Sequence, residues 1–326
     1  MAQVSKTVVS NYLNGKYSSM SEGTRKRIQK LIEEYHYKPS PNRRNYYRKS
    51  TVHHKKVLGL ILPDITDNFY SFICKGVANA CTQNGYFAVT VNTDNNLLRE
   101  REYIDLLLNQ VDGFLVSTVG NNDEYLRNLQ SKTNIVMIDR GMLNSPYDLI
   151  SSNNKEAVEE LLDYLLALQY EAFAIFTEQL QPYTARTVRV GALSKYLEDK
   201  NTKIQYSVHT ISPNDEKVVM KELMGLYDRL LHKKIALIGV NGRTLLQILN
   251  GIKALGLEQR KNIGICGYDD FGWAQKMHSE IATISQPAIE IGMVAVQRLI
   301  FRVQSKQATP PEQIILKSTM QVFDSL

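Results

Sequence analysis

The stretch VLGLILPDITDNFYSFICKGVANACTQNGYFAVTV, residues 57–91, contains a strand, a helix and a second strand in direct succession. The apolar run at 57–62 predicts a buried strand, and residues 72–83 have the spacing of a helix that covers it. Residues 86–91 predict the next strand. A strand followed by a helix and another strand is typical of a parallel sheet.

The same alternation continues through most of the chain. Further strands are expected at 114–117 and 135–138, and a second series at 172–176, 205–210, 235–240 and 263–267. Helices are expected at 101–110, 156–168, 215–231 and 244–255. Two series of strands predict an α/β protein with two similar lobes, each with a parallel sheet that helices cover on both faces.

Composition places the chain among globular proteins. It has 326 residues, 43% hydrophobic and 22% charged, a length that suggests two or three domains. No apolar run approaches the roughly 18–20 residues of a membrane helix, and the start lacks the apolar segment of a signal peptide. The three cysteines have no metal-ligand spacing and are expected to be thiols in a reducing cytosol. We therefore expect a cytoplasmic protein without a metal or cofactor.

Positive charge is concentrated at the amino-terminal end. Residues 1–56 hold thirteen Lys and Arg and three acids, a net charge of +10. The remainder holds 26 of the 39 basic and 30 of the 33 acidic residues, a net charge of −4. A basic arm on an acidic body indicates a polyanionic partner for one end of the chain. From charge alone, a solubilising tail is the alternative.

The first residues predict a short helix at 5–14 with Ser5 as its N-cap. One face is apolar, and the other carries short polar groups and one lysine: Lys6, Thr7, Ser10, Asn11 and Asn14. This polar face suits base edges and phosphates, because Asn pairs with adenine, Lys with guanine, and Ser or Thr with phosphate oxygens. A second helix follows, with Ser21 as its cap and an apolar stripe from Ile28 to Tyr35.

The stretch VSKTVVSNYLNG, residues 4–15, resembles the recognition-helix signature of the LacI/GalR family of bacterial repressors. Ser21, Thr24-Arg25 and Tyr37-Lys38-Pro39 continue the resemblance, which extends nearly to the end of the chain. It implies that Lys6, Thr7 and Asn11 read bases and that Ser5, Ser10 and Asn14 contact phosphates. Tyr46 takes the position of the family's leucine wedge in the minor groove. Double-stranded operator DNA and a second copy of the chain are the implied partners, and the helix at 72–83 is the expected dimer surface.

The resemblance also implies domain boundaries. Residues 1–38 would be a helix-turn-helix headpiece that lacks its first helix, 39–56 a hinge linker, and 57–326 a two-lobed sensor like the periplasmic binding proteins. The first lobe would comprise about 57–153 and 286–313, and the second about 154–285 and 314–326. Residues 281–285 and 314–317 are expected to cross between them. Because family members carry another helix before this point, we expect weak DNA binding without it.

Ligands of parallel sheets bind at the carboxyl ends of the strands. The resemblance places effector contacts there at Phe69, Tyr70, Arg189, Asn241, Asp269 and Gln286. Arg186 would share a helix face with Arg189, so the pair could clamp a carboxylate. Core packing of Phe69 and Tyr70 and a solvated salt-bridge face for the arginines are the alternatives. Trp273 could stack on a sugar ring or belong to the core.

The pattern Phe176-Thr177-Glu178 with the paired arginines, Asn241-Gly242, and Asp269-Asp270 followed by Trp273 is similar to the KdgR-like branch of the family. That branch implies a repressor of carbohydrate-utilisation genes that senses ketodeoxygluconate or a related sugar acid. A periplasmic-type sugar-binding protein without DNA function is the alternative, but it would need an export signal and has no use for a basic arm. No nucleotide-binding, nucleophile-elbow or metal motif predicts an enzyme.

Overall fold

The computed structural model describes residues 4–13, 20–34, 55–200, 204–212, 216–258, 260–269, 272, 281–305 and 309–322. The chain forms two compact units, residues 1–54 and 55–326. Three predicted site residues, Asn14, Tyr46 and Trp273, lie outside the described residues.

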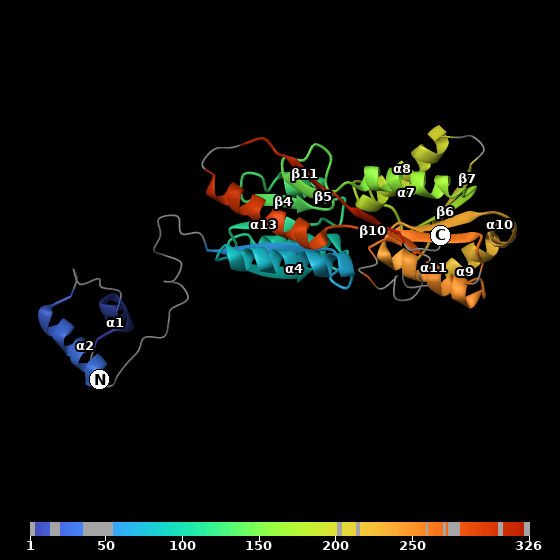
Figure 1. The fold of residues 1–326 in the computed structure, drawn as a ribbon. Coiled ribbons are helices and arrows are strands. Elements are labelled where there is room, and N and C mark those ends of the chain that lie inside the picture. The colour runs from blue at the N-terminus through green and yellow to red at the C-terminus, as the bar shows by residue number, and fades with distance from the viewer. Residues whose placement is uncertain are drawn as a thin grey trace. The chain divides into compact units, whose positions relative to one another are not determined.

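The described part of the first unit consists of two helices that contact each other, α1 (Lys6–Leu13) and α2 (Glu22–Glu34) (Figure 1). α1 begins directly after Ser5, as predicted. The Ser21 hydroxyl caps α2 by accepting a hydrogen bond of 3.3 Å from the amide three residues further on. Ile28, from the predicted apolar stripe of α2, is buried.

The second unit contains two sheets (Figure 1). The first sheet is made of β1 (Val57–Leu62), β2 (Phe87–Asn92), β3 (Gly113–Val116), β4 (Asn134–Ile138), β5 (Asp148–Ser152) and β11 (Gln313–Leu316). Its order is β11-β5-β4-β3-β1-β2, with all described neighbours parallel. The second sheet is made of β6 (Ala172–Thr177), β7 (Gln205–Thr210), β8 (Ile235–Gly239), β9 (Ile263–Tyr268), β10 (Ile281–Ser285) and β12 (Thr319–Gln321). Its order is β12-β10-β9-β8-β6-β7, and β12 pairs antiparallel with β10. The predicted fold of two mainly parallel sheets is confirmed.

Helices cover both faces of each sheet. The first sheet lies between α4 (Asn68–Gln83) with α13 (Ala288–Gln304) on one face and α5 (Leu97–Leu107) with α6 (Asp123–Arg127) on the other. The second lies between α7 (Asn154–Ala167) with α8 (Ala185–Lys200) and the group of α9 (Glu216–Gly225), α10 (Tyr227–His232) and α11 (Gly242–Ala254).

The continuous apolar run of β1 follows from this layering. Leu58 and Leu60 pack against α4 and α13, whereas Ile61 belongs to the core on the opposite face. A strand that is buried on both faces needs apolar side chains at consecutive positions. No helix among the described residues is both long enough and apolar enough to span a membrane.

Four segments differ from the prediction, and the first is 281–285, which was expected to cross between the lobes but forms β10 of the second sheet. β5 was not expected, because its sequence DLISS ends in two serines, which are buried all the same. The helix expected at 215–231 consists of α9 and α10, which are separated at Leu226. β11 is an edge strand of the first sheet, so the last crossing follows residue 316 and not residue 313.

The crossing segments of the described chain lie at residue 153, at 286–287 and at 317–318, and they bond to one another. The Asn153 amide donates to the Leu316 carbonyl at 3.0 Å, and the Ser318 amide donates to Asn153 Oδ1 at 2.6 Å. The Ser152 hydroxyl donates to Gln286 Oε1 at 2.6 Å. The two lobes are therefore joined by a hydrogen-bonded bundle of chain segments.

α4 and α13 pack closely at two glycines. A Cβ atom at Gly76 would lie 2.0 Å from the carbonyl oxygen of Ile289, and one at Gly292 would lie 2.5 Å from that of Ile73. Because both obstacles are backbone atoms, an alanine at either position would force the helices apart. We expect Gly76→Ala to lower the free energy of unfolding by about 1–3 kcal/mol, measured by urea denaturation.

Gly191, on the exposed side of α8, provides the matched control. A Cβ atom there would have no neighbour within 4 Å among the atoms considered, so Gly191→Ala should raise the free energy of unfolding by about 0.5–1 kcal/mol. Similar effects of the two substitutions would contradict close packing of α4 on α13.

Candidate ligand-binding site between the lobes

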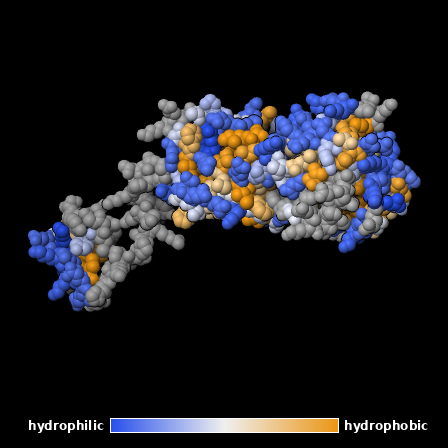
Figure 2. Space-filling model, in the orientation of Figure 1, coloured by the Kyte–Doolittle hydropathy of each residue, from blue (hydrophilic) through white to orange (hydrophobic). Residues whose placement is uncertain are grey.

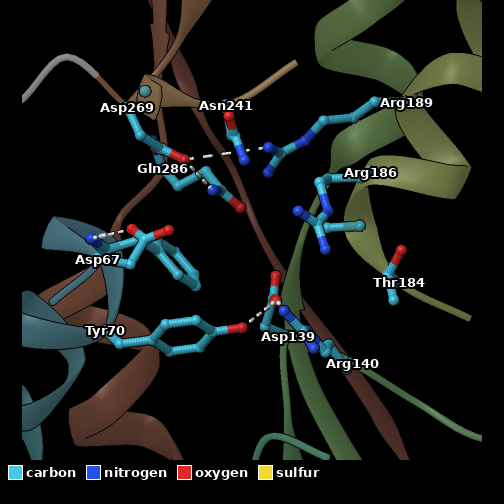
Figure 3. Close-up of a pocket in the computed structure, with 13 residues that line it drawn as sticks. Asp67, Tyr70, Asp139, Arg140, Thr184, Arg186, Arg189, Asn241, Asp269 and Gln286 are labelled. Carbon is cyan, nitrogen blue, oxygen red and sulfur yellow. Dashed lines mark hydrogen bonds and ion pairs between the residues drawn. The ribbon is translucent and has the colours of Figure 1, made fainter. Parts of the chain in front are cut away.

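A cavity of about 50 Å³ lies between the two lobes (Figure 3). It is lined by Asp67, Phe69, Tyr70, Asp139, Arg140, Thr184, Ala185, Arg186, Arg189, Asn241, Gly242, Asp269 and Gln286. These residues follow the carboxyl ends of β1, β4, β6, β8, β9 and β10. The strand ends of two facing sheets thus supply side chains to one space, as expected for parallel sheets.

Residues after β1 form one wall of the cavity. Asp67 caps α4, since its Oδ1 accepts a hydrogen bond of 3.0 Å from the Phe69 amide. The Phe69 and Tyr70 rings meet edge to face with centroids 5.3 Å apart, and both are buried in the core of the first lobe. The rings therefore pack in the core, as the alternative interpretation had it, and they also line the cavity.

Asp139 and Arg140 directly follow β4 and line the cavity from the first lobe. Asp139 accepts a hydrogen bond from the Tyr70 hydroxyl at 3.4 Å. Burial raises the pKa of Asp139, although Arg140 and Arg189 act against the shift. The Arg140 guanidinium lies 5.8 Å from the centroid of the Tyr70 ring, and its Nη1 donates to the Thr118 carbonyl at 3.2 Å. Neither residue was predicted, although the strand-end rule applied to the segment after β4 would have found both.

Arg189 lies on α8 in the opposite wall, with 2% of its side chain exposed. Nε donates to Asn154 Oδ1 at 2.7 Å, Nη1 donates to the Val240 carbonyl at 2.8 Å, and the guanidinium lies 3.9 Å from the centroid of the Tyr268 ring. Nη1 also lies 3.9 Å from Asp269 Oδ2. Nη2 is buried and has no hydrogen-bond partner among the described residues. Two N–H groups and one face of the guanidinium are therefore committed to the protein, and Nη2 remains for a ligand.

Arg186, one turn earlier on α8, forms an ion pair with Glu178. Burial and the nearby positive charge of Arg140 lower the pKa of Arg186. Asn241 Nδ2 donates to Glu178 Oε2 at 3.3 Å, and Glu178 Oε1 is buried without a hydrogen-bond partner among the described residues. Glu178 belonged to the sequence pattern but was not predicted as a site residue, and Thr184 was not predicted either.

Asn241 and Gly242 lie where β8 leads into α11. Asn241 caps this helix, because its Oδ1 accepts a hydrogen bond of 2.9 Å from the Thr244 amide. A Cβ atom at Gly242 would lie 2.6 Å from the Asp269 carbonyl oxygen. The backbone of the two loops therefore approaches closely here, which explains the glycine that follows Asn241.

Asp269 is 5% exposed and adopts a positive φ of 59° after β9. Gln286 Nε2 donates to Asp269 Oδ2 at 2.5 Å, and the Gln286 amide donates to Oδ1 at 3.2 Å. Burial raises the pKa of Asp269 to about 6, while the charge of Arg189 opposes the shift. Gln286 thus connects a carboxyl group of the cavity to Ser152 at the first crossing.

Further contacts join the lobes beside the cavity. Arg243 Nη2, at the start of α11, donates to Asp64 Oδ2 at 2.5 Å and to the Thr66 hydroxyl at 3.0 Å. The Gly141 amide donates to the Tyr183 carbonyl at 3.3 Å. The structure therefore has its lobes in contact around the cavity.

All the predicted effector residues that the structure describes line this cavity: Phe69, Tyr70, Arg186, Arg189, Asn241, Asp269 and Gln286. Other lining residues were missed: Asp67, Asp139, Arg140, Thr184, Ala185 and Gly242. Of the residues predicted to contact DNA, Ser5 directly precedes α1, and Lys6, Thr7, Ser10 and Asn11 belong to it.

Comparisons with known proteins extend these observations. Residues 55–323 match the family described as periplasmic binding proteins and sugar binding domain of LacI family, and residues 1–40 match bacterial regulatory proteins, lacI family. The transcriptional regulator KdgR of Bacillus subtilis is 30% identical over 311 residues, which cover 95% of this chain and 91% of the relative. The regulator PtxS of Pseudomonas plecoglossicida is 29% identical over 325 residues, or 99% and 93% of the two chains.

Solved structures share the fold at lower identity. The complex of the transcriptional regulator CelR with cellobiose has a TM-score of 0.70 at 19% identity and covers 99% of this chain and 97% of its own. The lac repressor dimer bound to operator and the anti-inducer ONPF has a TM-score of 0.71 at 19% identity, with coverage of 99% and 96%. The family matches span both units, and the chain belongs to the LacI family of bacterial regulatory proteins.

Proposed function

We propose that this protein is a transcriptional repressor of carbohydrate-utilisation genes whose affinity for operator DNA is controlled by a small sugar acid bound between the lobes. The observation that carries the proposal is the cavity lined by Arg140, Arg186 and Arg189. Arg189 Nη2 is buried without a hydrogen-bond partner among the described residues, so it is a donor that a ligand oxygen would satisfy. Guanidinium groups also match the geometry of a carboxylate.

The other lining residues suit a polyhydroxylated ligand. Carboxylate and amide oxygens of Asp269, Asn241 and Gln286 accept hydrogen bonds from hydroxyl groups, and the amide nitrogens donate to them. The Phe69 ring offers an apolar surface to the carbon atoms of a sugar.

The DNA-binding role rests on the first unit. We propose that Lys6, Thr7 and Asn11 of α1 read base edges. Phosphate contacts come from Ser5, Ser10 and Asn14, and Tyr46 contacts the minor groove. The net charge of +10 over residues 1–56 supports this assignment, because phosphate neutralisation supplies much of the affinity for DNA. A protein that binds chromosomal operators works in the bacterial cytoplasm.

We further propose a homodimer, since a single short helix contacts few bases and paired helices read two half-sites. Hydrophobic groups appear among hydrophilic ones on the surface of the second unit (Figure 2). Near the start of this unit, Phe72 of α4 and Phe87 and Val89 of β2 are 38%, 74% and 39% exposed. These three side chains would be buried in a dimer that pairs α4 with its copy.

The experiment has two stages. Operator sequences are first selected from a random double-stranded library with the chain extended by the family's preceding headpiece helix, and the affinity for the selected DNA is then measured by fluorescence anisotropy. The measurement is repeated with D-gluconate, D-galacturonate and 2-keto-3-deoxygluconate, and with the uncharged D-glucitol and D-galactose. We expect at least one acid to raise the melting temperature and to change the affinity for DNA by about 5–150-fold, and the uncharged sugars to do neither.

Each failure has a distinct meaning. Equal binding of neutral and acidic sugars would contradict the sugar-acid assignment. An acid that binds without changing DNA affinity would contradict the regulatory coupling, and a selection that yields no preferred sequence would contradict the repressor role.

A further inference from the structure

Two arginines of the cavity come from different lobes. Arg140 follows β4 in the first lobe, and Arg186 lies in the first turn of α8 in the second lobe. Figure 3 shows both side chains directed into the same space. Their side chains are 10% and 18% exposed, and the charge of Arg140 contributes to the lowered pKa of Arg186. The two lobes therefore bring like charges together at the cavity.

Arg189 is less suited to hold a carboxylate than its position suggests. Nε and Nη1 already donate to Asn154 and Val240, and one face of the guanidinium covers the Tyr268 ring. A bidentate contact needs two adjacent N–H groups on one edge of the guanidinium. Because Nε is engaged, the Nε–Nη2 edge of Arg189 cannot hold a carboxylate in a bidentate way, and the N–H groups of Nη2 remain for other ligand oxygens, for example those of hydroxyl groups.

Arg140 and Arg186 also retain N–H donors. A guanidinium carries five N–H groups. The described contacts of Arg140 are with Thr118, Tyr70 and Asp139, and those of Arg186 are with Glu178. Both residues can therefore present further N–H groups to a ligand without losing the contacts that hold them.

The start of α8 adds a third source of positive potential. Thr184 and Ala185 line the cavity beside Arg186, so the N-terminus of this sixteen-residue helix faces the ligand space. The first amides of a helix lack intrahelical partners, and the helix dipole places partial positive charge there. An anion at this place would contact the helix start and both arginines.

We propose that the anionic group of the effector binds between Arg140 and Arg186 and thereby joins the two lobes. This inference rests on the proposed sugar-acid function, and it adds which residues hold the acid and what the acid does. Without an anion, the like charges of the two guanidinium groups oppose each other across the cavity, and the ion pairs with Asp139 and Glu178 offset this repulsion only in part. A bound carboxylate replaces this repulsion with two attractions, so it favours the arrangement in which the lobes are in contact.

Four carboxylates near the arginines limit the range over which their positive charge acts. Asp67 lies 3.8 Å from Arg243, Asp139 accepts from Tyr70, Asp269 accepts from Gln286, and Glu178 is paired with Arg186. Their negative charge balances much of the positive charge of the arginines. The acid is therefore bound by directed N–H groups and not by a general positive field, and its affinity should change little with ionic strength, since buried pairs are weakly screened.

The test is calorimetry on the full chain with matched pairs of probes, D-gluconate against D-glucitol and D-galacturonate against D-galactose. Arg140→Met and Arg186→Met should each lower the affinity for the acid by about 30-fold or more, because each removes one partner of a buried charge contact. The double variant should lose much less than the product of the two losses, since both arginines hold the same anion. Arg99→Met, at an exposed ion pair with Asp94, is the control and should bind like the wild type.

Small-angle scattering gives an independent readout. The acid should reduce the radius of gyration of the wild type but not of Arg140→Met, because the bridge between the lobes is missing. If Arg140→Met does not unfold cooperatively, Arg140→Lys provides the same measurement. Lysine keeps the positive charge but lacks the paired N–H groups of a guanidinium, so we expect an intermediate loss of affinity.

The outcomes separate the inference from the function on which it rests. Wild-type protein that binds the neutral probes as well as the acids would overturn the sugar-acid function itself. Wild-type protein that prefers acids while Arg140→Met, or Arg140→Lys in its place, binds them with unchanged affinity would overturn the bridge alone.

Discussion

Arg189→Met should lose the binding of acidic sugars and should be less stable than the wild type by about 3–5 kcal/mol at pH 7.5. The guanidinium is almost fully buried and compensates the buried carboxyl group of Asp269. Removing one partner of a buried ion pair leaves an uncompensated charge, which is far more costly than the loss of a surface pair. The substitution also removes the donors to Asn154 and to the Val240 carbonyl.

The loss of stability in Arg189→Met should depend on pH. With Arg189 present, the pKa of Asp269 in the folded protein is about 6, above its ordinary value of 3.8. A raised carboxyl pKa means that the folded state holds a proton that the unfolded state has released, so stability falls as the pH rises from about 4 to 6. Without Arg189 this pKa rises further, and the window extends to higher pH.

Urea denaturation at pH 5.5 and 7.5 measures this effect. We expect the difference between wild type and Arg189→Met to be smaller at pH 5.5, where protonation of Asp269 removes the unpaired charge. Lys200→Met, at the exposed end of the same helix, is the control and should change stability by less than about 0.5 kcal/mol. A deficit that is equal at both pH values would contradict the assigned role of Asp269.

Asp148→Ala should lower the free energy of unfolding by about 3–5 kcal/mol. The Asp148 carboxylate is fully buried at the start of β5, and it accepts hydrogen bonds from Arg298 Nε at 2.8 Å, from Arg302 Nε at 2.6 Å and from the Glu312 amide at 2.7 Å. It therefore holds α13 and the segment before β11 against the first sheet. An alanine leaves two mostly buried arginines without this acceptor.

The wild-type contribution of Asp148 should disappear in strong acid. Burial alone would raise the pKa of Asp148, but hydrogen bonds from Arg302 and Arg298 lower it to about 2. A lowered carboxyl pKa stabilises the folded state above the unfolded value of 3.8, and this stabilisation is lost as the pH falls through about 2. The difference between the two values corresponds to about 2–3 kcal/mol.

Urea denaturation at pH 7 compares Asp148→Ala with Asp163→Ala. Asp163 also contacts a cation, Lys200, but its side chain is 62% exposed, and its loss should change stability by less than about 1 kcal/mol. Equal midpoints for the two variants would show that the buried cluster contributes no more than an exposed pair.

Sequence patterns predicted those parts of the fold in which the hydropathy of each residue matches its burial. Runs such as 57–62 and 172–176 are apolar at consecutive positions because both faces of the sheet are covered. β5 was missed because it ends in Ser151 and Ser152, which are polar but buried, and the Ser152 hydroxyl donates to Gln286. The break between α9 and α10 at Leu226 was also missed, because apolar periodicity continues across it.

The candidate site shows a similar division. Residues at the ends of predicted strands, such as Asp269 and Asn241, could be placed at the cavity because parallel strands end at one edge. The proximity of Arg140 to Arg186 could not be predicted, because it depends on how one lobe faces the other. The extent to which Arg189 is committed to Asn154 and Val240 could not be seen either, since both contacts depend on the packing of α8.

The hydrogen bonds of Gln286 and Asn154 have a mechanical consequence. Gln286 holds Asp269 with its amide nitrogen and Ser152 with its oxygen, and Asn154, beside the first crossing, holds Arg189. Two side chains of the cavity are thus fastened to the backbone about which any rotation of the lobes must turn. A ligand that displaces either side chain by a small distance therefore also shifts the crossing segments, about which the lobes would rotate. For a given angle of rotation about the crossing segments, the atoms at the far ends of the lobes move the greatest distance.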